Sequence, residues 1–337
     1  MIFAAQKHGN VSFFVPHKGC PCACSFCDQR AISGACADVT PQQAADTAER
    51  GLTYRKPDTS LEFAFFGGSF TAIDRTLMQS LLDAVQPYIG PGGYTGIRIS
   101  TRPDAIDEEV LDILEDARVT AIELGAQSMN DSVLKANRRG HTAQDVVNAA
   151  HLIRAHGFSL GLQMMTGLYQ SDPDKDTATA KALLALQPDT VRIYPTLVMR
   201  GTLLAQLFEA GVYRPQTLDE AVGLCTNLLD LFENAGVRVI RVGLHDTRSL
   251  SDGLVAGPYH PAFRELCDNK RYYDKIRSRL KAPCRATVYV APQDLSKAAG
   301  QRRCNIERLA QAGVHIIMKP DPGLAPGEYS IEKEGNV

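Results

Sequence analysis

Residues 19–30 read GCPCACSFCDQR and place Cys20, Cys24 and Cys27 on one short loop. The loop follows a β-rich run at residues 10–17 (NVSFFVPH), which predicts a first strand. Three thiolates on one loop can face a common centre, which is the geometry that a cubic iron–sulfur cluster needs. The stretch therefore predicts a metal-binding loop at the carboxyl end of a strand, where α/β barrels carry their chemistry.

Zinc is the main alternative for this loop. A structural zinc site usually takes four ligands in two separated pairs, and the sequence has no second Cys-x2-Cys. As the fourth zinc ligand, Cys22 would strain the tetrahedral geometry, and His17 is the more plausible additional ligand. Cys36 has no assigned role. Three ligands on a four-iron cube leave one iron open, as catalytic metal sites do. The odd total of nine cysteines argues against a disulfide framework.

Strand-like and helix-like runs alternate along the first two thirds of the chain. Further strands are expected at 61–66, 97–101, 120–127, 160–165, 190–196 and 237–242, and helices at 41–55, 74–88, 107–117, 142–156, 175–186, 202–210 and 219–234. This rhythm predicts parallel pairing through right-handed crossovers. We expect an α/β fold with a partial (β/α)6 TIM-like barrel over residues 10–245, and a doubly wound sheet is the alternative.

The rhythm changes in the last third. Residues 249–261 have the composition of a linker or long loop. A strand at 287–290, a helix at 302–312 and a strand at 315–318 predict a small C-terminal α/β appendage within residues 246–319. We expect this appendage to cap the barrel mouth and residues 320–337 to be a loosely held tail.

Charge is unevenly distributed over the 337 residues, whose net charge is −2. Residues 264–319 carry thirteen Lys and Arg against five Asp and Glu, whereas the preceding 263 residues are mildly acidic. The chain therefore has no global field for nucleic acid or membranes, but it has one local basic segment. The first residues lack the apolar core of a signal peptide, and no apolar run approaches the length of a membrane span. These features predict a soluble, cytoplasmic protein.

The cysteine pattern, with an aromatic residue before its last cysteine, resembles the signature of radical S-adenosylmethionine (SAM) enzymes. FFGGSFTAI, which ends the second strand, fits the Gly-Gly turn of that superfamily. Longer motifs resemble the radical SAM half of the Elongator catalytic subunit from about residue 13 to about residue 260: RISTRPD, IELGAQSM, NRRGHT, GLQMMTGL and RIYPTLV. The resemblance implies a [4Fe–4S] cluster and SAM as cofactors, an external one-electron donor, and a 5′-deoxyadenosyl radical that abstracts hydrogen from a substrate.

The resemblance also implies residue roles, each with a structural alternative. Phe26 would lie near the adenine of SAM, or simply pack within its loop. SAM contacts are implied for Gly67, Gly68, Ser69, Ser100, Thr101, Arg102, Gln127, Ser128 and Gln163. The alternatives are a tight turn at the two glycines, the start of a helix at Arg102, a buried amide that caps the sheet at Gln127, and packing inside the barrel for Gln163. Substrate contacts are implied more weakly for Arg138, Arg139, His141, Tyr194 and His260, which would otherwise be solvated, packed inside the barrel or part of a turn.

Two departures from the Elongator pattern limit what can be carried over. We see no acetyltransferase-like domain, and so no evident site for acetyl-coenzyme A. Ser100 stands where an acidic residue is expected before Thr-Arg-Pro-Asp. Transfer RNA is therefore a substrate by analogy.

The basic segment at residues 270–285 (KRYYDKIRSRLKAPCR) offers independent support for RNA. Its tyrosines and its cations, among them Lys275, Arg277 and Arg279, have the composition of a phosphate-binding surface. The alternative is an amphipathic helix with a solvated charged face. Three hypotheses remain open: a radical SAM enzyme acting on RNA, one acting on a small molecule or a protein side chain, and a non-catalytic metal-bearing RNA-binding module.

Overall fold

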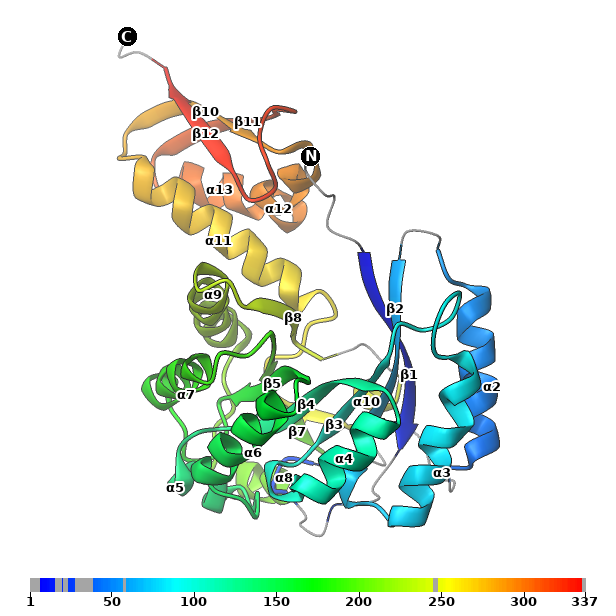
Figure 1. The fold of residues 1–337 in the computed structure, drawn as a ribbon. Coiled ribbons are helices and arrows are strands. Elements are labelled where there is room, and N and C mark those ends of the chain that lie inside the picture. Colours follow the sequence, from blue (N-terminus) through cyan, green and yellow to red (C-terminus); the bar gives the residue numbers. More distant parts are fainter. Residues whose placement is uncertain are drawn as a thin grey trace.

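The computed structural model describes residues 7–15, 20, 24–27, 39–56, 59–244 and 248–334. Its main feature is a seven-stranded parallel sheet that curls into a half-barrel with helices on its outer face (Figure 1). The strands follow the order β1 (Lys7–Val15), β2 (Thr59–Gly67), β3 (Ile97–Thr101), β4 (Val119–Gln127), β5 (Ser159–Thr166), β6 (Thr190–Pro195) and β8 (Arg238–Val242). This confirms the partial barrel. The doubly wound alternative is excluded, because its strand order would reverse at a switch point.

The helices of the barrel lie between successive strands, as expected. They are α2 (Pro41–Thr53), α3 (Arg75–Val85), α4 (Glu108–Asp116), α5 (Asp131–Ala136), α6 (Ala143–Ala155), α7 (Pro173–Ala185), α8 (Leu203–Glu209) and α9 (Leu218–Asn234). Side-chain caps fix where they begin: Thr40 closes a capping box on α2, and Thr217 closes one on α9. None of the helices in the described part of the chain has the length and hydrophobicity of a membrane span.

The two faces of the barrel strands differ in chemistry. Apolar side chains such as Phe63, Ile99 and Leu124 are fully buried in the core between the sheet and the helices. The alternating positions, such as Arg98 and Glu123, face the inside of the half-barrel. Because a strand reverses face at each residue, the same short runs supply both a packed core and a polar lumen.

The appendage is a separate three-stranded sheet with its own core. Its strands have the order β11 (Val314–Pro320), β10 (Cys284–Val290) and β12 (Tyr329–Lys333), and α12 (Leu295–Ala299) and α13 (Cys304–Gln311) accompany them. The long helix α11 (Phe263–Arg279) joins it to the barrel. Buried residues at the start of α11, such as Cys267, belong to the barrel core, and later ones, such as Ile276, belong to the appendage core. The boundary between the barrel core and the appendage core thus falls within α11, beyond the expected domain boundary at residue 245.

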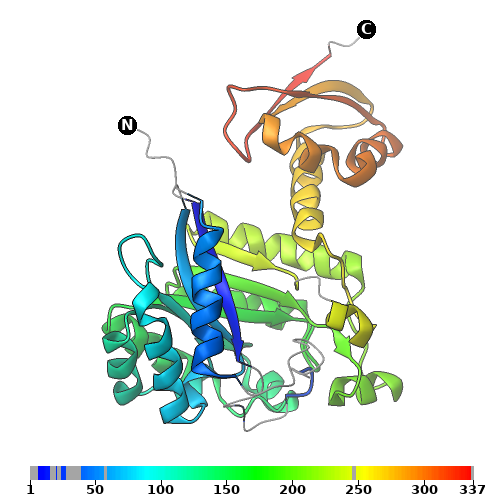
Figure 2. The same ribbon diagram turned by 90° about the vertical axis from the view of Figure 1, so that its right-hand side faces the viewer.

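Three expectations about this part differ from the structure. The supposed linker at 249–261 contains α10 (Arg248–Gly253) and β9 (Leu254–Ala256), which pairs with β7 (Val198–Met199). The tail is not loose at 329–333, because Tyr329 and Ile331 pack on the appendage core while β12 pairs with β10. Figures 1 and 2 place the appendage at the end of the barrel where β1 begins, so it does not cap the mouth where β1 ends.

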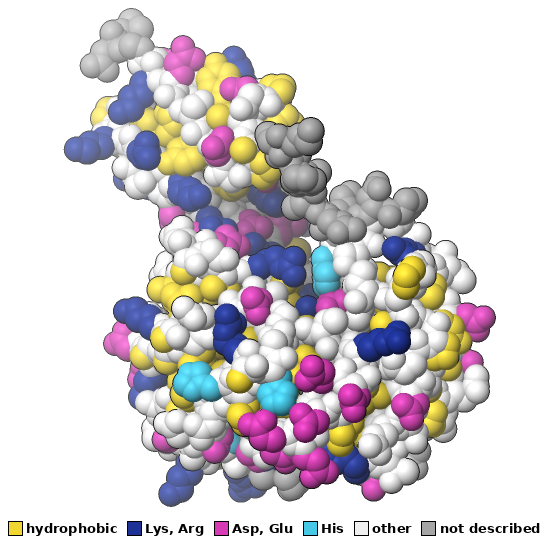
Figure 3. All heavy atoms as spheres, in the orientation of Figure 1, with side chains coloured by type: hydrophobic (Ala, Val, Ile, Leu, Met, Phe, Trp, Pro, Cys, Tyr) yellow, Lys and Arg dark blue, Asp and Glu magenta, His cyan; other side chains and the backbone are white. Residues whose placement is uncertain are grey.

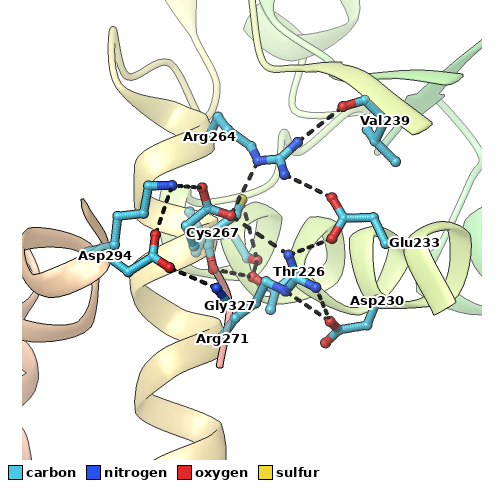
Figure 4. Close-up of polar contacts among 12 residues, drawn as sticks. Thr226, Asp230, Glu233, Val239, Arg264, Cys267, Arg271, Asp294 and Gly327 are labelled. Atoms are coloured by element: carbon cyan, nitrogen blue, oxygen red, sulfur yellow. Dashed lines mark hydrogen bonds and ion pairs between the residues drawn. The ribbon is translucent and has the colours of Figure 1, made fainter. Parts of the chain in front are cut away.

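Ion pairs fix α11 against the barrel (Figure 4). Arg264 donates to Glu233 on α9 at 2.9 Å, and Arg271 donates to Asp230 at 2.8 Å and lies 2.7 Å from Glu233. On the appendage side, Asn305 on α13 donates to the carbonyl of Asn269 on α11 at 2.7 Å, and Lys297 on α12 lies 3.9 Å from Asp268. These contacts hold the appendage to the barrel through one helix.

Candidate active site at the carboxyl ends of the strands

Two of the three predicted cluster ligands lie on one well-anchored turn. The backbone N–H of Cys27 donates to the carbonyl of Cys24 at 3.2 Å. Between them, Ser25 is fully buried and its hydroxyl donates to Asn137 Oδ1 at 2.6 Å. The Ser25 carbonyl accepts at 2.7 Å from the N–H of Leu204, the first turn of α8. The turn is therefore held between α5 and α8, at the end of the barrel where β1 ends.

The described residues do not include a preassembled metal site. Cys20 is exposed, and within the described ranges no three His, Cys, Asp or Glu side chains converge on one point. Cys22, Cys36 and His17 lie outside the described residues. The cluster ligand set of Cys20, Cys24 and Cys27 therefore stays a prediction.

Phe26 lies on the same turn. It packs against an apolar group that includes Val198, Leu204 and Tyr213. This position agrees with the loop-packing alternative for Phe26. A contact with adenine stays a prediction.

A buried arginine links this turn to the sheet. Arg139 donates from one guanidinium nitrogen to Cys24 Sγ at 3.3 Å and from another to the carbonyl of Gly125 on β4 at 2.7 Å. Its third nitrogen, Nε, is buried and has no partner among the described residues. A cationic donor beside a sulfur suits its use as a metal ligand, because the thiolate is the ligating form.

The Gly-Gly turn after β2 lies directly against the end of β1. Gly67 has φ +122°, and a Cβ built on it would stand 2.5 Å from the carbonyl oxygen of Val15. The N–H of Gly68 donates to that same oxygen at 2.9 Å. Only glycine fits this close approach, which leaves backbone exposed at the strand ends for a ligand.

The hydroxyl groups next to the Gly-Gly turn form hydrogen bonds with other residues of the protein. Ser69 is fully buried, lies 2.9 Å from the hydroxyl of Thr101, and accepts the backbone N–H of Arg102 at 3.1 Å. The Arg102 guanidinium pairs with Asp104 at 2.9 Å. These contacts tie the ends of β2 and β3 together, whereas Ser100 lies on the lumen side and is partly exposed. Direct contacts of these four residues with SAM stay predictions.

The end of β4 carries the clearest sign of a ligand site. Gln127 has φ +62° beside a register shift between β4 and β5, and its side-chain oxygen is buried without a partner among the described residues. Folded proteins rarely leave a buried amide oxygen unpaired, and strained backbone collects at functional sites. A bound group that donates a hydrogen bond to Gln127 would account for both features. Ser128, by contrast, already accepts the N–H of Asn130 at 3.1 Å.

His141 and Arg138 follow α5. His141 is buried and its Nε2 lies 3.2 Å from the carbonyl of Ala126. Burial and the adjacent Arg139 lower the pKa of His141 to about 4, so its ring is neutral at pH 7 and positions the end of β4. Arg138 is exposed and lines a surface cleft with Lys135.

The charged floor of the lumen was not predicted from the sequence. Glu123 accepts from Arg192 at 2.6 and 2.9 Å and from Arg98 at 3.4 Å, and Arg98 also donates to Glu62 at 2.8 Å. Burial alone would raise the pKa of Glu62, but hydrogen bonds from His8 and Arg98 bring it down to about 2. A charged residue within four of the predicted strand runs, β2, β3, β4 and β6, was the signal that would have found this floor.

Two predicted residues belong to this floor. Gln163 donates to Glu123 at 2.8 Å, so its amide is already held by the protein. Tyr194 is the next inward residue after Arg192 on β6, and burial raises its pKa. The Arg192 guanidinium also lies 5.1 Å from the centre of the Phe66 ring, just before the Gly-Gly turn. The floor therefore supports the strand ends from below.

The remaining predicted substrate residues lie in two places. His260 lies near the carboxyl ends of β6 and β8, where it lines a small cavity with Pro195 and Gly243. His260 accepts the N–H of Ala262 at 3.1 Å, as the turn alternative expects. Lys275, Arg277 and Arg279 lie on α11, where Arg277 donates to the Leu280 carbonyl at 2.9 Å. The helix alternative for the basic segment is thus correct as to structure, and a role in RNA binding stays a prediction.

Comparisons with known proteins show which proteins this chain is similar to. The family model of the radical SAM superfamily matches residues 14–180, and that of the radical SAM C-terminal domain matches residues 188–273. Over 229 residues the chain is 29% identical to the tRNA uridine(34) acetyltransferase of Dehalococcoides mccartyi (strain CBDB1), which covers 64% of this chain and 49% of that protein. It is 30% identical over 227 residues to Elongator complex protein 3 of Homo sapiens, covering 61% and 41%. The chain thus spans half or less of these relatives.

Among solved structures, the archaeal Elp3 of Methanocaldococcus infernus superposes with a TM-score of 0.65 at 22% identity. The superposition covers 83% of this chain and 65% of that one. At this identity the match shows the fold.

Proposed function

The chain belongs to the radical SAM superfamily, and on that premise we propose that it uses a [4Fe–4S] cluster and SAM to modify a transfer RNA in the cytoplasm. Cys20, Cys24 and Cys27 would hold the cluster, and an external one-electron donor would supply the electron. When bound and reduced, the cluster and SAM supply a 5′-deoxyadenosyl radical that abstracts hydrogen from the substrate.

One observation carries the cofactor half of this proposal. At the carboxyl end of β4, the Gln127 amide oxygen has no partner among the residues that the structure describes. It lies two residues from Gly125, whose carbonyl is bound by the arginine that also contacts Cys24. A polar ligand next to the cysteine turn would satisfy the Gln127 amide oxygen and the Nε of Arg139. SAM has the amino, carboxylate and ribose groups to do so.

The chain's own residues would orient the cofactor and exclude water. The turn at Gly67 and Gly68 offers backbone at the strand ends, and the Ser69–Thr101 contact keeps β2 and β3 in register beside it. Below them, the lumen floor pairs Arg98 with Glu62 and Arg192 with Glu123, so these four charges balance one another. Such a fixed polar floor suits chemistry that must keep solvent away from a reactive group.

The RNA half of the proposal rests on two supports. Curated relatives are named for tRNA uridine 34 and for the Elongator complex. The basic segment places Lys275, Arg277 and Arg279 on one helix, with both arginines exposed. Lysine and arginine contacts to phosphates supply most of the nonspecific affinity for RNA.

The test is a nucleoside analysis after reaction. Protein reconstituted with iron and sulfide without oxygen would be incubated with SAM, dithionite and total transfer RNA, and the RNA would then be digested and analysed by mass spectrometry. We expect a nucleoside of changed mass that depends on both protein and SAM. The alternative result is that SAM is cleaved without any change in the RNA, and to the same extent when the RNA is left out. That result would favour a small-molecule or protein substrate.

A further inference from the structure

The sheet of the appendage is covered on one face only. Inward side chains such as Val288, Val290 and Val314 are fully buried against α11 and α13. Because side chains alternate along a strand, their neighbours point to the opposite side. We call this side the open sheet face; it consists of Arg285, Thr287, Tyr289, His315, Ile317, Lys319, Ser330 and Glu332.

The middle of the open sheet face combines an aliphatic and an aromatic side chain. Ile317 is 55% exposed and lies opposite Thr287 in the register of β10 and β11. Tyr289, in the next row, is partly exposed. A single exposed isoleucine is ordinary, but here it adjoins an aromatic ring on an uncovered sheet, which is a surface on which flat groups can stack.

Cations flank these two side chains. Arg285 lies opposite His315 at one end of the face, and Lys319 lies opposite Tyr289 at the other end. The acidic Glu332 accepts the Tyr289 hydroxyl at 3.0 Å. Figure 3 shows further Lys and Arg side chains along one side of the appendage. Asp321 also lies close enough to raise the pKa of Tyr289, so the charges on the open sheet face itself are nearly balanced. The appendage and its connecting helix as a whole are basic, because residues 264–334 carry fourteen Lys and Arg against nine Asp and Glu. This excess favours an anionic partner.

We propose that the open sheet face binds a single-stranded segment of the RNA substrate, an inference that rests on the RNA half of the proposed function. Bases would stack on Tyr289 and Ile317, and Arg285 and Lys319 would contact phosphates. Proteins bind single strands by this combination of aromatic platforms and cationic tracks.

The position of the appendage agrees with a macromolecular substrate. It lies beyond the amino ends of the barrel strands, whereas the cysteine turn lies at their carboxyl ends (Figures 1 and 2). β1 has nine residues, and nine residues of strand extend over about 30 Å. A small metabolite cannot touch both ends, but a folded RNA can present one segment to the appendage and another to the active site.

The test is the binding of labelled oligouridine and total transfer RNA to the full-length protein at several salt concentrations. Lys319→Glu should weaken binding and lower the slope of log affinity against log salt by about 0.7, the value for one lost phosphate contact on a single strand. Tyr289→Leu should weaken binding about tenfold with little change in slope, because stacking carries no charge.

A matched control separates this face from net charge. Lys333 is exposed on β12 and pairs with Ala286, so it lies on the covered side of the same sheet. Lys333→Glu makes the same change in charge and should bind RNA as the wild type does. Thermal unfolding of each variant would show that the appendage remains folded.

Several outcomes would overturn the inference. Equal weakening by Lys319→Glu and Lys333→Glu would mean that only net charge matters. Unchanged RNA binding in Lys319→Glu and Tyr289→Leu would mean that RNA binds elsewhere on the protein. An altered oligomeric state in Ile317→Ala, with RNA binding unchanged, would assign the open sheet face to self-association. If the wild type binds no RNA at all, the RNA half of the proposed function fails as well. If RNA stimulates SAM cleavage and the variants of the open sheet face behave as the wild type does, only this inference fails.

Discussion

Replacing Glu123 by Gln should destabilise the barrel by about 3–5 kcal/mol, the cost of removing one partner of a buried ion pair. The Glu123 side chain is 1% exposed and receives two hydrogen bonds from Arg192 and one from Arg98. Without its charge, Arg98 still has Glu62, but Arg192 stays buried without a carboxylate. The loss therefore falls mainly on the Arg192 pair.

The double variant Glu123→Gln/Arg192→Met isolates that cause. It removes both charges of the pair and leaves Glu62 bound to Arg98, so it should be more stable than the single variant. Guanidinium unfolding followed by far-UV circular dichroism at neutral pH measures both, with Glu209→Gln on the exposed end of α8 as the control. The account of the lumen floor is wrong if Glu123→Gln unfolds at the same denaturant concentration as the wild type. It is also wrong if the double variant is no more stable than the single one.

Three further variants test helix α7 and the site. Asp176 is a buried residue of α7 that accepts the backbone N–H of Gly167 at 2.8 Å. Burial raises the pKa of Asp176 from 3.8 to about 6, so its contribution to stability is full below about pH 4 and is lost as the pH rises through 6. Asp176→Asn should accordingly gain about 2–3 kcal/mol on the wild type between about pH 4 and pH 8 in denaturant titrations, and a pH-independent difference would refute this. Gly67→Ala puts a Cβ 2.5 Å from the Val15 carbonyl at φ +122° and should cost about 1–3 kcal/mol with loss of SAM binding by calorimetry; full binding would show that the turn adapts. Arg139→Met removes the contact to Cys24 and should lower the iron retained after reconstitution, with Arg139→Lys in between; equal iron in all three proteins would show that this contact is dispensable.

The barrel was predictable because its signals are local. Short apolar runs separated by amphipathic segments define parallel strands and crossover helices, and Thr40 and Thr217 mark helix starts by their own hydrogen bonds. The strand Tyr329–Lys333 was missed because its two core-facing residues lie between polar neighbours and close after glycine and proline. Its place is decided by pairing with β10, which a local pattern does not contain.

The candidate site was predictable in position more than in role. Motifs at strand ends located Gly67 and Gln127 correctly, because parallel strands bring their carboxyl ends to one rim. The sequence could not show that Ser69 and Thr101 bind each other, or that Glu123 bridges two arginines from other strands. Such contacts join residues 25 to 69 positions apart, so they appear only once the sheet has curled.

The most direct test of the central claim combines iron content with product formation. The protein would be purified without oxygen, reconstituted with iron and sulfide, and given SAM and dithionite, and 5′-deoxyadenosine would be quantified beside Cys24→Ala. We predict about four irons per chain and 5′-deoxyadenosine in the wild type, with both the open-site cluster and the product lost in the variant. Bound zinc with no cluster, or equal 5′-deoxyadenosine from Cys24→Ala, would contradict the account.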